Sequence, residues 1–423
     1  MRKSLWRYSA VFLLCGISVS THAQQALSWE QVRDRFERNN PTLRAGIDNV
    51  SESRAEEITA NLRPNPDFSV STDGTQIAPY HGVWRPFAGT DVVPGVSYLI
   101  EREHKRGLRL QSARWATDIA ISNQSDLERT LMFSLRNAFV QTLLAKAVYG
   151  VAQENLTYYD HVLDVSQEQF KVGGIARVDL DRLELQRVQY ESDLQSALVN
   201  LRTAKIQLLT LLNDRTPIDQ FDVAGTYDFS EQISPLQDYR DQALATRPDL
   251  KAAQQSVDKA KTDHRLAIAN GSTDPTVGAW WTYNSSNNNP YGLYAIGASV
   301  SIPLRIFDRN QGEKLRTQLD IDRNQRLFDA TQAQVFSDVD SAYATLMSNI
   351  TLLKPYKEKY LKQAVSVRDT ITFSYQHGGA SLLDFLSAEN DYRAVELSYV
   401  NLVGAYLTAA SQLNLAVGKE VLP

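Results

Sequence analysis

The chain has 423 residues but only one cysteine and three methionines. A selective soft-metal site needs several converging sulfur or imidazole ligands, so we expect no resident metal. The histidines are scattered and never show the His-x-x-x-His spacing of a helical metal site. Because no converging acid, base and nucleophile is visible either, the sequence predicts neither a cofactor nor an enzyme.

Long hydrophobic runs and excess positive charge are also missing. No segment reaches about 18 consecutive apolar residues, which excludes a polytopic helical membrane protein. Lys and Arg total 44 against 49 Asp and Glu, a formal net charge of −5. This balance, with no basic cluster beyond the N-terminus, argues against a nucleic-acid partner. The mean hydropathy of −0.34 is that of an ordinary soluble protein.

Residues 1–23 have the pattern of a secretory signal peptide. Three cations precede an apolar stretch over residues 10–19, and Thr21-His22-Ala23 offers small residues at the cleavage site. Cleavage there would remove Cys15, the only cysteine. We do not expect lipidation at Cys15, because a leucine rather than a small residue precedes it. The exported chain would then be stabilised by packing without disulfides.

Short motifs recur in the same order about 205 residues apart, a constant spacing that indicates an internal duplication. Gly173-Gly174 followed by Asp179 recurs as Gly378-Gly379 followed by Asp384. Upstream, Asn40-Pro41 recurs as Arg247-Pro248. Separate turn signals would explain each match alone but not the constant spacing.

The predicted organisation follows from this duplication. Each repeat should hold a helix that begins at the proline mark, a β-hairpin, a long helix, a Gly-Gly turn and a shorter helix. The predicted boundaries are a first repeat over 24–212 with a hairpin at 67–100, a linker at 213–239, a second repeat over 240–418 with a hairpin at 276–302, and a tail at 419–423.

Two segments carry a strict 3.5-residue period, the seam of a left-handed coiled coil. Apolar or small residues recur in alternating steps of four and three from Leu131 to Phe170 and from Phe385 to Ala416. Since no proline occurs from Glu101 to Phe170, one helix of about 70 residues and roughly 100 Å is possible there. The seams fit either a periplasmic rod or close packing among several helices.

The predicted hairpins alternate in polarity. Phe68 and Val70 fall on one face of their strand, and Ser69 and Ser71 fall on the other. Segments of about 9 to 11 residues suit tilted strands that cross a bilayer. Four strands would leave unpaired edges in lipid, so insertion requires oligomerisation, and three copies would supply twelve strands. The alternative is a soluble sheet that caps the helices.

Aromatic residues gather in or beside the hairpins. Such a density fits the interfacial girdles of a membrane barrel. A small hydrophobic core beneath a soluble sheet is the other interpretation. The residues are Tyr80, Trp84, Phe87, Trp280, Trp281, Tyr283, Tyr291 and Tyr294.

Taken together, the signal peptide, seams, hairpins and duplication resemble the TolC-like outer-membrane efflux protein family, over roughly Leu27 to Gly418. The segment Ile302–Gly312 is similar to the CzcC-type branch, which serves cobalt–zinc–cadmium cation efflux. The resemblance implies an α+β membrane protein that is a homotrimer. Four β-strands per chain would complete a twelve-stranded outer-membrane β-barrel, continued by a long coiled-coil α-helical barrel in the periplasm.

The same resemblance implies roles for the repeated turns. Gly173, Gly174, Asp179, Gly378 and Gly379 would form the periplasmic tip that contacts an adaptor. Asp384 and Ser387 would lie at the channel constriction, where three copies of Asp384 would form an acidic ring that attracts cations. The plainer interpretation of Asp384 and Asp179 is an exposed acid in the first turn of a helix.

One departure from the family bears on gating. Well-known members carry a second aspartate and an arginine where this chain has Ser387 and Ala380. A gate closed by salt bridges of that kind is therefore not expected here, and a weaker or differently closed gate is predicted.

The function implied by the resemblance is a passive exit duct of a tripartite efflux system. Its partners would be outer-membrane lipid, a periplasmic adaptor and an inner-membrane pump of the RND type, and its cargo heavy-metal cations. The same duct in drug efflux or type I protein secretion is one alternative. A soluble periplasmic coiled-coil tether is the alternative of another class.

Overall fold

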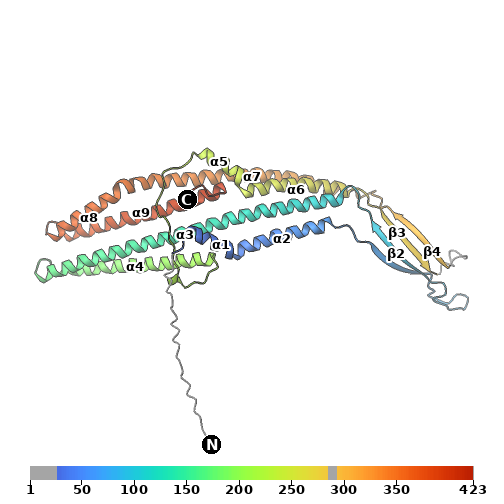
Figure 1. The fold of residues 1–423 in the computed structure, drawn as a ribbon, viewed down its shortest axis with the longest axis horizontal. Helices are drawn as coiled ribbons and strands as arrows, with labels where there is room; N and C mark the ends of the chain where they lie inside the picture. Colours follow the sequence, from blue (N-terminus) through green and yellow to red (C-terminus); the bar gives the residue numbers. More distant parts are fainter. Residues whose placement is uncertain (1–25, 284–292, 423) are drawn as a thin grey trace, which may run out of the picture.

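The computed structural model describes residues 26–283 and 293–422. The expected signal peptide, Cys15 and Tyr291 lie outside the described residues. The molecule is elongated, with the strands at one end and the turns between long helices at the other (Figure 1). None of the described helices is long and apolar enough to cross a membrane.

The two halves of the chain have similar orders of elements, in which two helices precede two strands and the longer helices follow. The first half contains α1 (Trp29–Asn39), α2 (Pro41–Asn61), β1 (Asp67–Asp73), β2 (Asp91–Leu99), α3 (Lys105–Lys171) and α4 (Arg177–Leu211). A short 3-10 helix (Ile218–Gln220) follows. The second half contains α5 (Leu236–Thr246), α6 (Pro248–Asn270), β3 (Thr276–Tyr283), β4 (Tyr294–Ser301), α7 (Gln311–Pro355), a π-helical turn (Tyr356–Tyr360), α8 (Leu361–Gln376) and α9 (Leu382–Val417).

The short helices α1 and α5 are additions to the predicted plan. The Ser28 hydroxyl accepts a hydrogen bond from the backbone of Gln31, whose side chain accepts one from Ser28, so a capping box starts α1. Asn40 then caps α2 by accepting from Leu43 N at 3.0 Å. The spacing Ser28-x-x-Gln31 is the sequence pattern from which α1 could have been predicted. Because α5 begins at Leu236, the irregular linker is shorter than predicted.

The seam of α3 is confirmed. This helix runs for 67 residues, about 100 Å at 1.5 Å per residue. Seam residues Leu135, Thr142, Tyr159, Leu163 and Ser166 are buried, and the other predicted seam positions of α3 are partly buried. The helix therefore directs one continuous stripe toward its neighbours.

The long helix predicted in the second half is interrupted. Pro355 ends α7, and the π-helical turn separates it from α8. Proline removes a backbone donor and its ring collides with the preceding turn, so a regular helical ladder cannot run through this position. The first strand has 7 residues, fewer than the predicted length of about 9 to 11. It ends at Asp73, and the next residue, Gly74, adopts a φ of +73°.

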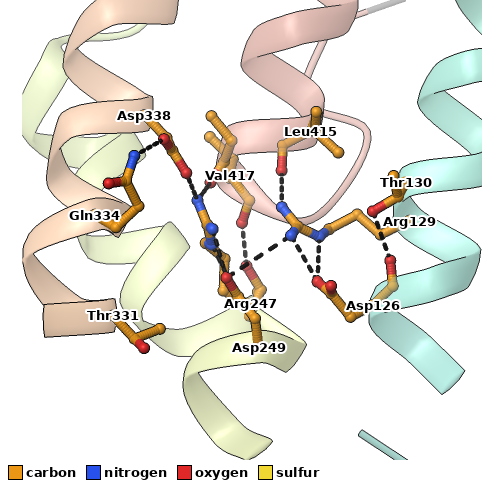
Figure 2. Close-up of polar contacts among 12 residues, drawn as sticks. Asp126, Arg129, Thr130, Arg247, Asp249, Thr331, Gln334, Asp338, Leu415 and Val417 are labelled. Carbon is orange, nitrogen blue, oxygen red and sulfur yellow. Dashed lines mark hydrogen bonds and ion pairs between the residues drawn. The ribbon is translucent and has the colours of Figure 1, made fainter. Parts of the chain in front are cut away.

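Buried charged groups join α9 to α6 and α7 near the middle of the molecule (Figure 2). The Arg247 side chain is only 4% exposed. Its guanidinium donates to Asp249 Oδ1 at 3.0 Å and to Asp338 Oδ2 at 2.7 Å. Burial alone would raise the pKa of Asp249, but the hydrogen bonds from Arg247 outweigh it and hold the pKa below its usual range.

The same region satisfies the carbonyls at the end of α9. Arg129 donates to the carbonyl of Leu415, Arg247 to that of Ala416 at 3.3 Å, and Thr246 Oγ1 to that of Val417 at 2.6 Å. The last carbonyls of a helix have no partners within the helix and carry partial negative charge. Two guanidinium groups and one hydroxyl thus fix the C-terminus of α9 against the first half and α6.

We expect Arg247→Met to lower the free energy of unfolding by about 3 kcal/mol, because two carboxylates lose their partner in a largely buried site. Denaturant unfolding followed by helical circular dichroism would measure it. Since the pKa of Asp249 is depressed in the folded state, this stabilisation should be present near neutral pH and be lost as the pH falls through that value.

The control is Arg240→Met, which breaks the more exposed pair with Asp340 at 2.6 Å. Exposed pairs contribute little. Equal losses for the two variants would contradict a special role for Arg247.

Candidate functional site

The four strands form one antiparallel sheet in the order β1-β2-β3-β4. Its register pairs Phe68 with Val96, Val277 with Val300, and Trp281 with Ile296. Directly paired residues share a face of the sheet, and alternate residues along each strand do so too. One face is therefore apolar or aromatic apart from Thr72. Its members are Phe68, Val70, Val92, Pro94, Val96, Tyr98, Val277, Ala279, Trp281, Tyr283, Tyr294, Ile296, Ala298 and Val300.

This apolar face is open. Phe68 is 73% exposed, Val300 66% and Ile296 88%. A soluble sheet would bury such a face against a core, because a large contiguous apolar surface in water is unfavourable. Nothing in the described part of the chain covers these three side chains.

The opposite face consists mainly of small and polar residues such as Ser69, Ser97 and Ser299. Trp280 is its aromatic exception and lies on the opposite face from Trp281. Adjacent residues of a strand point to opposite faces. The Trp280 ring lies against Gly297, where an added Cβ would sit 2.4 Å from the indole Cε2. Any larger residue would displace the indole.

The two outer strands have only one partner each. β1 pairs with β2, and β4 pairs with β3, within the described sheet. An edge strand presents a row of unpaired N–H and C=O groups, which cost several kcal/mol each in hydrocarbon. The sheet is thus incomplete wherever its apolar face is in contact with lipid.

The two Gly-Gly turns have the same geometry. Gly173 and Gly378 adopt φ values of +79° and +76°, in the left-handed region that favours glycine. Gly174 N donates to Gln169 O at 2.7 Å, and Gly379 N donates to Ser374 O at 2.7 Å. These bonds are those of a Schellman motif, which satisfies the last carbonyls of α3 and α8.

The two turns are also joined in space. The side-chain amide of Gln169, at the end of α3, donates to the carbonyl of Gln376, at the end of α8, at 3.0 Å. Figure 1 places both turns at the end of the molecule opposite the sheet. The predicted tip residues Gly173, Gly174, Gly378 and Gly379 are all exposed there.

Asp384 begins α9 as part of a capping box with Ser381. Its Oδ2 accepts from Ser381 N at 3.1 Å and from Ser381 Oγ at 2.7 Å. These hydrogen bonds lower the pKa of Asp384, so its carboxylate stays charged in mild acid. Asp384 and Ser387 are both exposed. The first-turn interpretation therefore describes the local role of Asp384.

Asp179, the matching residue of the first half, lies in a different setting. The N-cap of α4 is Ala176, which offers no capping side chain. Asp179 is partly buried, and its Oδ1 lies 4.0 Å from Arg182. Equivalent positions in the two halves are therefore not chemically equivalent.

The structure adds a cluster above the turns that the sequence patterns did not indicate. The Arg368 guanidinium lies 4.7 Å from the ring centroid of Tyr158 and 4.0 Å from that of Tyr392. Arg393 lies 4.7 Å from the ring centroid of Tyr190. Such cation–π contacts join α8 and α9 to α3 and α4. The seam pattern contains Tyr392 but gives no hint of the arginines, which lie off the stripe.

Within residues 26–283 and 293–422, no group of three His, Cys, Asp or Glu residues is placed to hold a metal ion.

The fold and sheet are those of an outer-membrane efflux channel. The model of the outer membrane efflux protein family matches residues 32–214 and 239–419, and the chain belongs to this family. It is 20% identical to the cobalt-zinc-cadmium resistance protein CzcC of Cupriavidus metallidurans, over 90% of this chain and 87% of the relative.

Two further proteins are similar to this chain over most of its length. The pyoverdine export outer membrane protein OpmQ of Pseudomonas aeruginosa is 21% identical, over 98% of this chain and 90% of its own length. The solved structure of CusC superposes with a TM-score of 0.76 at 18% identity, covering 92% of each chain. At that identity, the superposition establishes the shared fold.

We expect Gly378→Ala to destabilise the second turn by about 1 kcal/mol, because an L side chain is disfavoured at positive φ even where space is free. No atom lies within 4 Å of the added Cβ, so any loss reports backbone strain alone. Amide hydrogen exchange over the turn would measure it.

Gly150→Ala is the matched control, since this glycine lies inside α3 and also has open space around it. It should be neutral or stabilising, because alanine favours the helix. Faster exchange over the second turn in the control would contradict the assignment.

Proposed function

We propose that this chain is the outer-membrane exit duct of a tripartite efflux system. It passively conducts substrates delivered by an inner-membrane pump, of the RND type, and a periplasmic adaptor. The observation that carries the proposal is the sheet, whose exposed apolar face and free edges suit lipid and not water. The helical body then extends into the periplasm, and the chain is not lipidated at Cys15.

The proposed assembly is a homotrimer. In this assembly β4 of one chain pairs with β1 of the next, and three sheets close a twelve-stranded barrel without edges. The helices support the same contact. Val178, Leu185, Val199 and Ile206 lie on α4 at intervals of seven or fourteen residues and are between 47% and 72% exposed. An exposed heptad stripe is an unfilled coiled-coil seam, which a helix of a second copy would fill.

The domain organisation is proposed on the same grounds. Two structural repeats, 24–212 and 240–418, share one element order and one turn geometry, which supports an internal duplication. Because both turns lie at one end, Gly173, Gly174, Asp179, Gly378 and Gly379 are assigned to the tip that meets the adaptor.

The proposed cargo is heavy-metal cations. The relative CzcC is named for cobalt, zinc and cadmium resistance, and three copies of Asp384 would form an acidic ring at the constriction. The likeness to OpmQ, named for pyoverdine export, favours a second candidate, in which the same duct exports organic molecules. In this proposal the pump and the adaptor select which substrate is transported.

We expect the double variant Val199→Glu, Ile206→Glu to lose the trimer, because three copies of each glutamate would be buried in the α4 seam. Light scattering of the detergent-solubilised protein measures the mass. The control Asn200→Glu, Gln207→Glu adds the same charges beside the stripe and should remain trimeric. A monomeric wild-type protein, or wild-type protein recovered in the soluble periplasm without detergent, would refute the duct.

We expect Asp384→Asn to reduce the cation-over-anion permeability ratio of single channels in planar bilayers by about twofold. The asparagine oxygen can still accept the Ser381 hydrogen bonds, so the change removes charge while keeping the cap. Asp179→Asn removes an acid from the first turn and should leave the ratio unchanged. An unaltered ratio in Asp384→Asn would count against the acidic ring.

A further inference from the structure

A buried glutamate lies about two helical turns after the start of α9 at Leu382, near the second tip turn. Glu389 of α9 is only 4% exposed, and its Oε1 has no hydrogen-bond partner among the described residues. Burying a carboxylate is costly unless it is fully paired or becomes neutral. This residue therefore needs an explanation that packing alone does not provide.

Groups from three other helices face Glu389. The hydroxyls of Tyr158 on α3 and Thr372 on α8, together with the Arg368 guanidinium, favour its charged form, whereas Asp369 opposes it. Arg368 is already engaged by Asp369 at 2.9 Å and by the rings of Tyr158 and Tyr392. The remaining titratable groups that interact with Glu389 are Tyr159 on α3 and Tyr190 on α4.

Burial outweighs these favourable neighbours. It raises the pKa of Glu389 from the ordinary 4.5 to about 7. Near neutral pH the residue is therefore divided between its neutral and charged forms while the helices stay packed around it. Exposure of the side chain to water would return its pKa toward the ordinary value.

The first half of the chain supplies an internal comparison. Glu184 occupies the position that corresponds to Glu389, five residues after Asp179 as Glu389 is after Asp384, and it is exposed. Burial of the acid is thus specific to the second hairpin. That hairpin is also the one whose first helix, α8, is separated from α7 by Pro355 and the π-helical turn, whereas α9 is continuous.

We propose that Glu389 is a proton-binding site that controls how tightly the α8–α9 hairpin packs against α3 and α4. With a proton bound, the neutral side chain fits the closed cluster of tyrosines. On deprotonation, the buried carboxylate lacks a partner for Oε1, and separation of the hairpin restores its hydration. The inference goes beyond the duct assignment, since it concerns packing within one chain.

The direction of the pH effect follows from proton linkage. The packed arrangement binds the proton more tightly than the separated one, so acid stabilises packing and a rise in pH through neutrality weakens it. With pKa values of about 7 packed and 4.5 separated, the equilibrium between the two should change about tenfold from pH 6 to pH 8.

Hydrogen exchange of the full-length protein tests this inference. After correction for the intrinsic pH dependence of exchange, amides of α8 should be about tenfold better protected at pH 6 than at pH 8. Glu389→Gln, a permanently neutral side chain of similar shape, should show the high protection at both pH values. Glu184→Gln should behave like the wild type.

Two results would overturn the inference. In the first, the difference in α8 protection between pH 6 and pH 8 persists in Glu389→Gln. In the second, the wild type shows no such difference. A direct measurement on the wild type guards against misfolding of the variant. The infrared carbonyl band of a protonated carboxylic acid should disappear with a midpoint near pH 7, and its absence at pH 6 would equally refute the site. Neither measurement requires conduction through the protein. The inference about Glu389 can therefore fail or hold independently of the proposed duct function.

Discussion

Backbone hydrogen bonding in the four-stranded sheet is the constraint on which the rest of the architecture depends. One chain supplies the internal pairs β1–β2, β2–β3 and β3–β4 but leaves an edge on either side. The face that contains Phe68, Ile296 and Val300 is equally incomplete, because it is exposed and apolar. In the proposed trimer, further copies of the chain would pair the edges and close the wall, whereas covering the face alone would leave the edges unpaired.

The helical body also has an exposed apolar surface, which lies at a distance from the sheet. Each long helix directs one seam toward its partners, and α4 retains a second, exposed stripe with the same seven-residue interval. In the proposed trimer, this second stripe would pack against a helix of the next chain, so the helices would close into a ring. The charged network around Arg247 lies where the two halves meet and satisfies carbonyl groups at the end of α9.

The two halves share a plan but differ in the capping, continuity and burial of the helices near their turns. The second tip turn has a capping box at Asp384 that the first lacks, and α7 is followed by a π-helical turn whereas α3 is continuous. Glu389 is buried where Glu184 is exposed. These differences all fall in the second half, after Pro355, in or next to the α8–α9 hairpin. The first hairpin, α3–α4, provides the continuous surface against which it packs.

The sequence by itself determined the local elements, because their causes are local. The prolines at 41 and 248 start helices, Gly173 and Gly378 permit positive φ, and the alternation from Phe68 onward separates two faces of a strand. The family motifs extended this to the fold and the tip. Helix α1 could have been found from the Ser28 capping box, whereas α5 begins after Pro235 without a capping side chain.

Only the tertiary structure decided which side chains lose water. Nothing in the heptad pattern distinguishes Glu389 from Glu184, since burial depends on Tyr158 of α3 and Thr372 of α8 arriving from distant parts of the chain. The partners of Arg247 and the position of Trp280 against Gly297 are likewise set by contacts between segments. Periodicity reports which way a residue faces along its own element, whereas desolvation and pairing depend on what lies opposite.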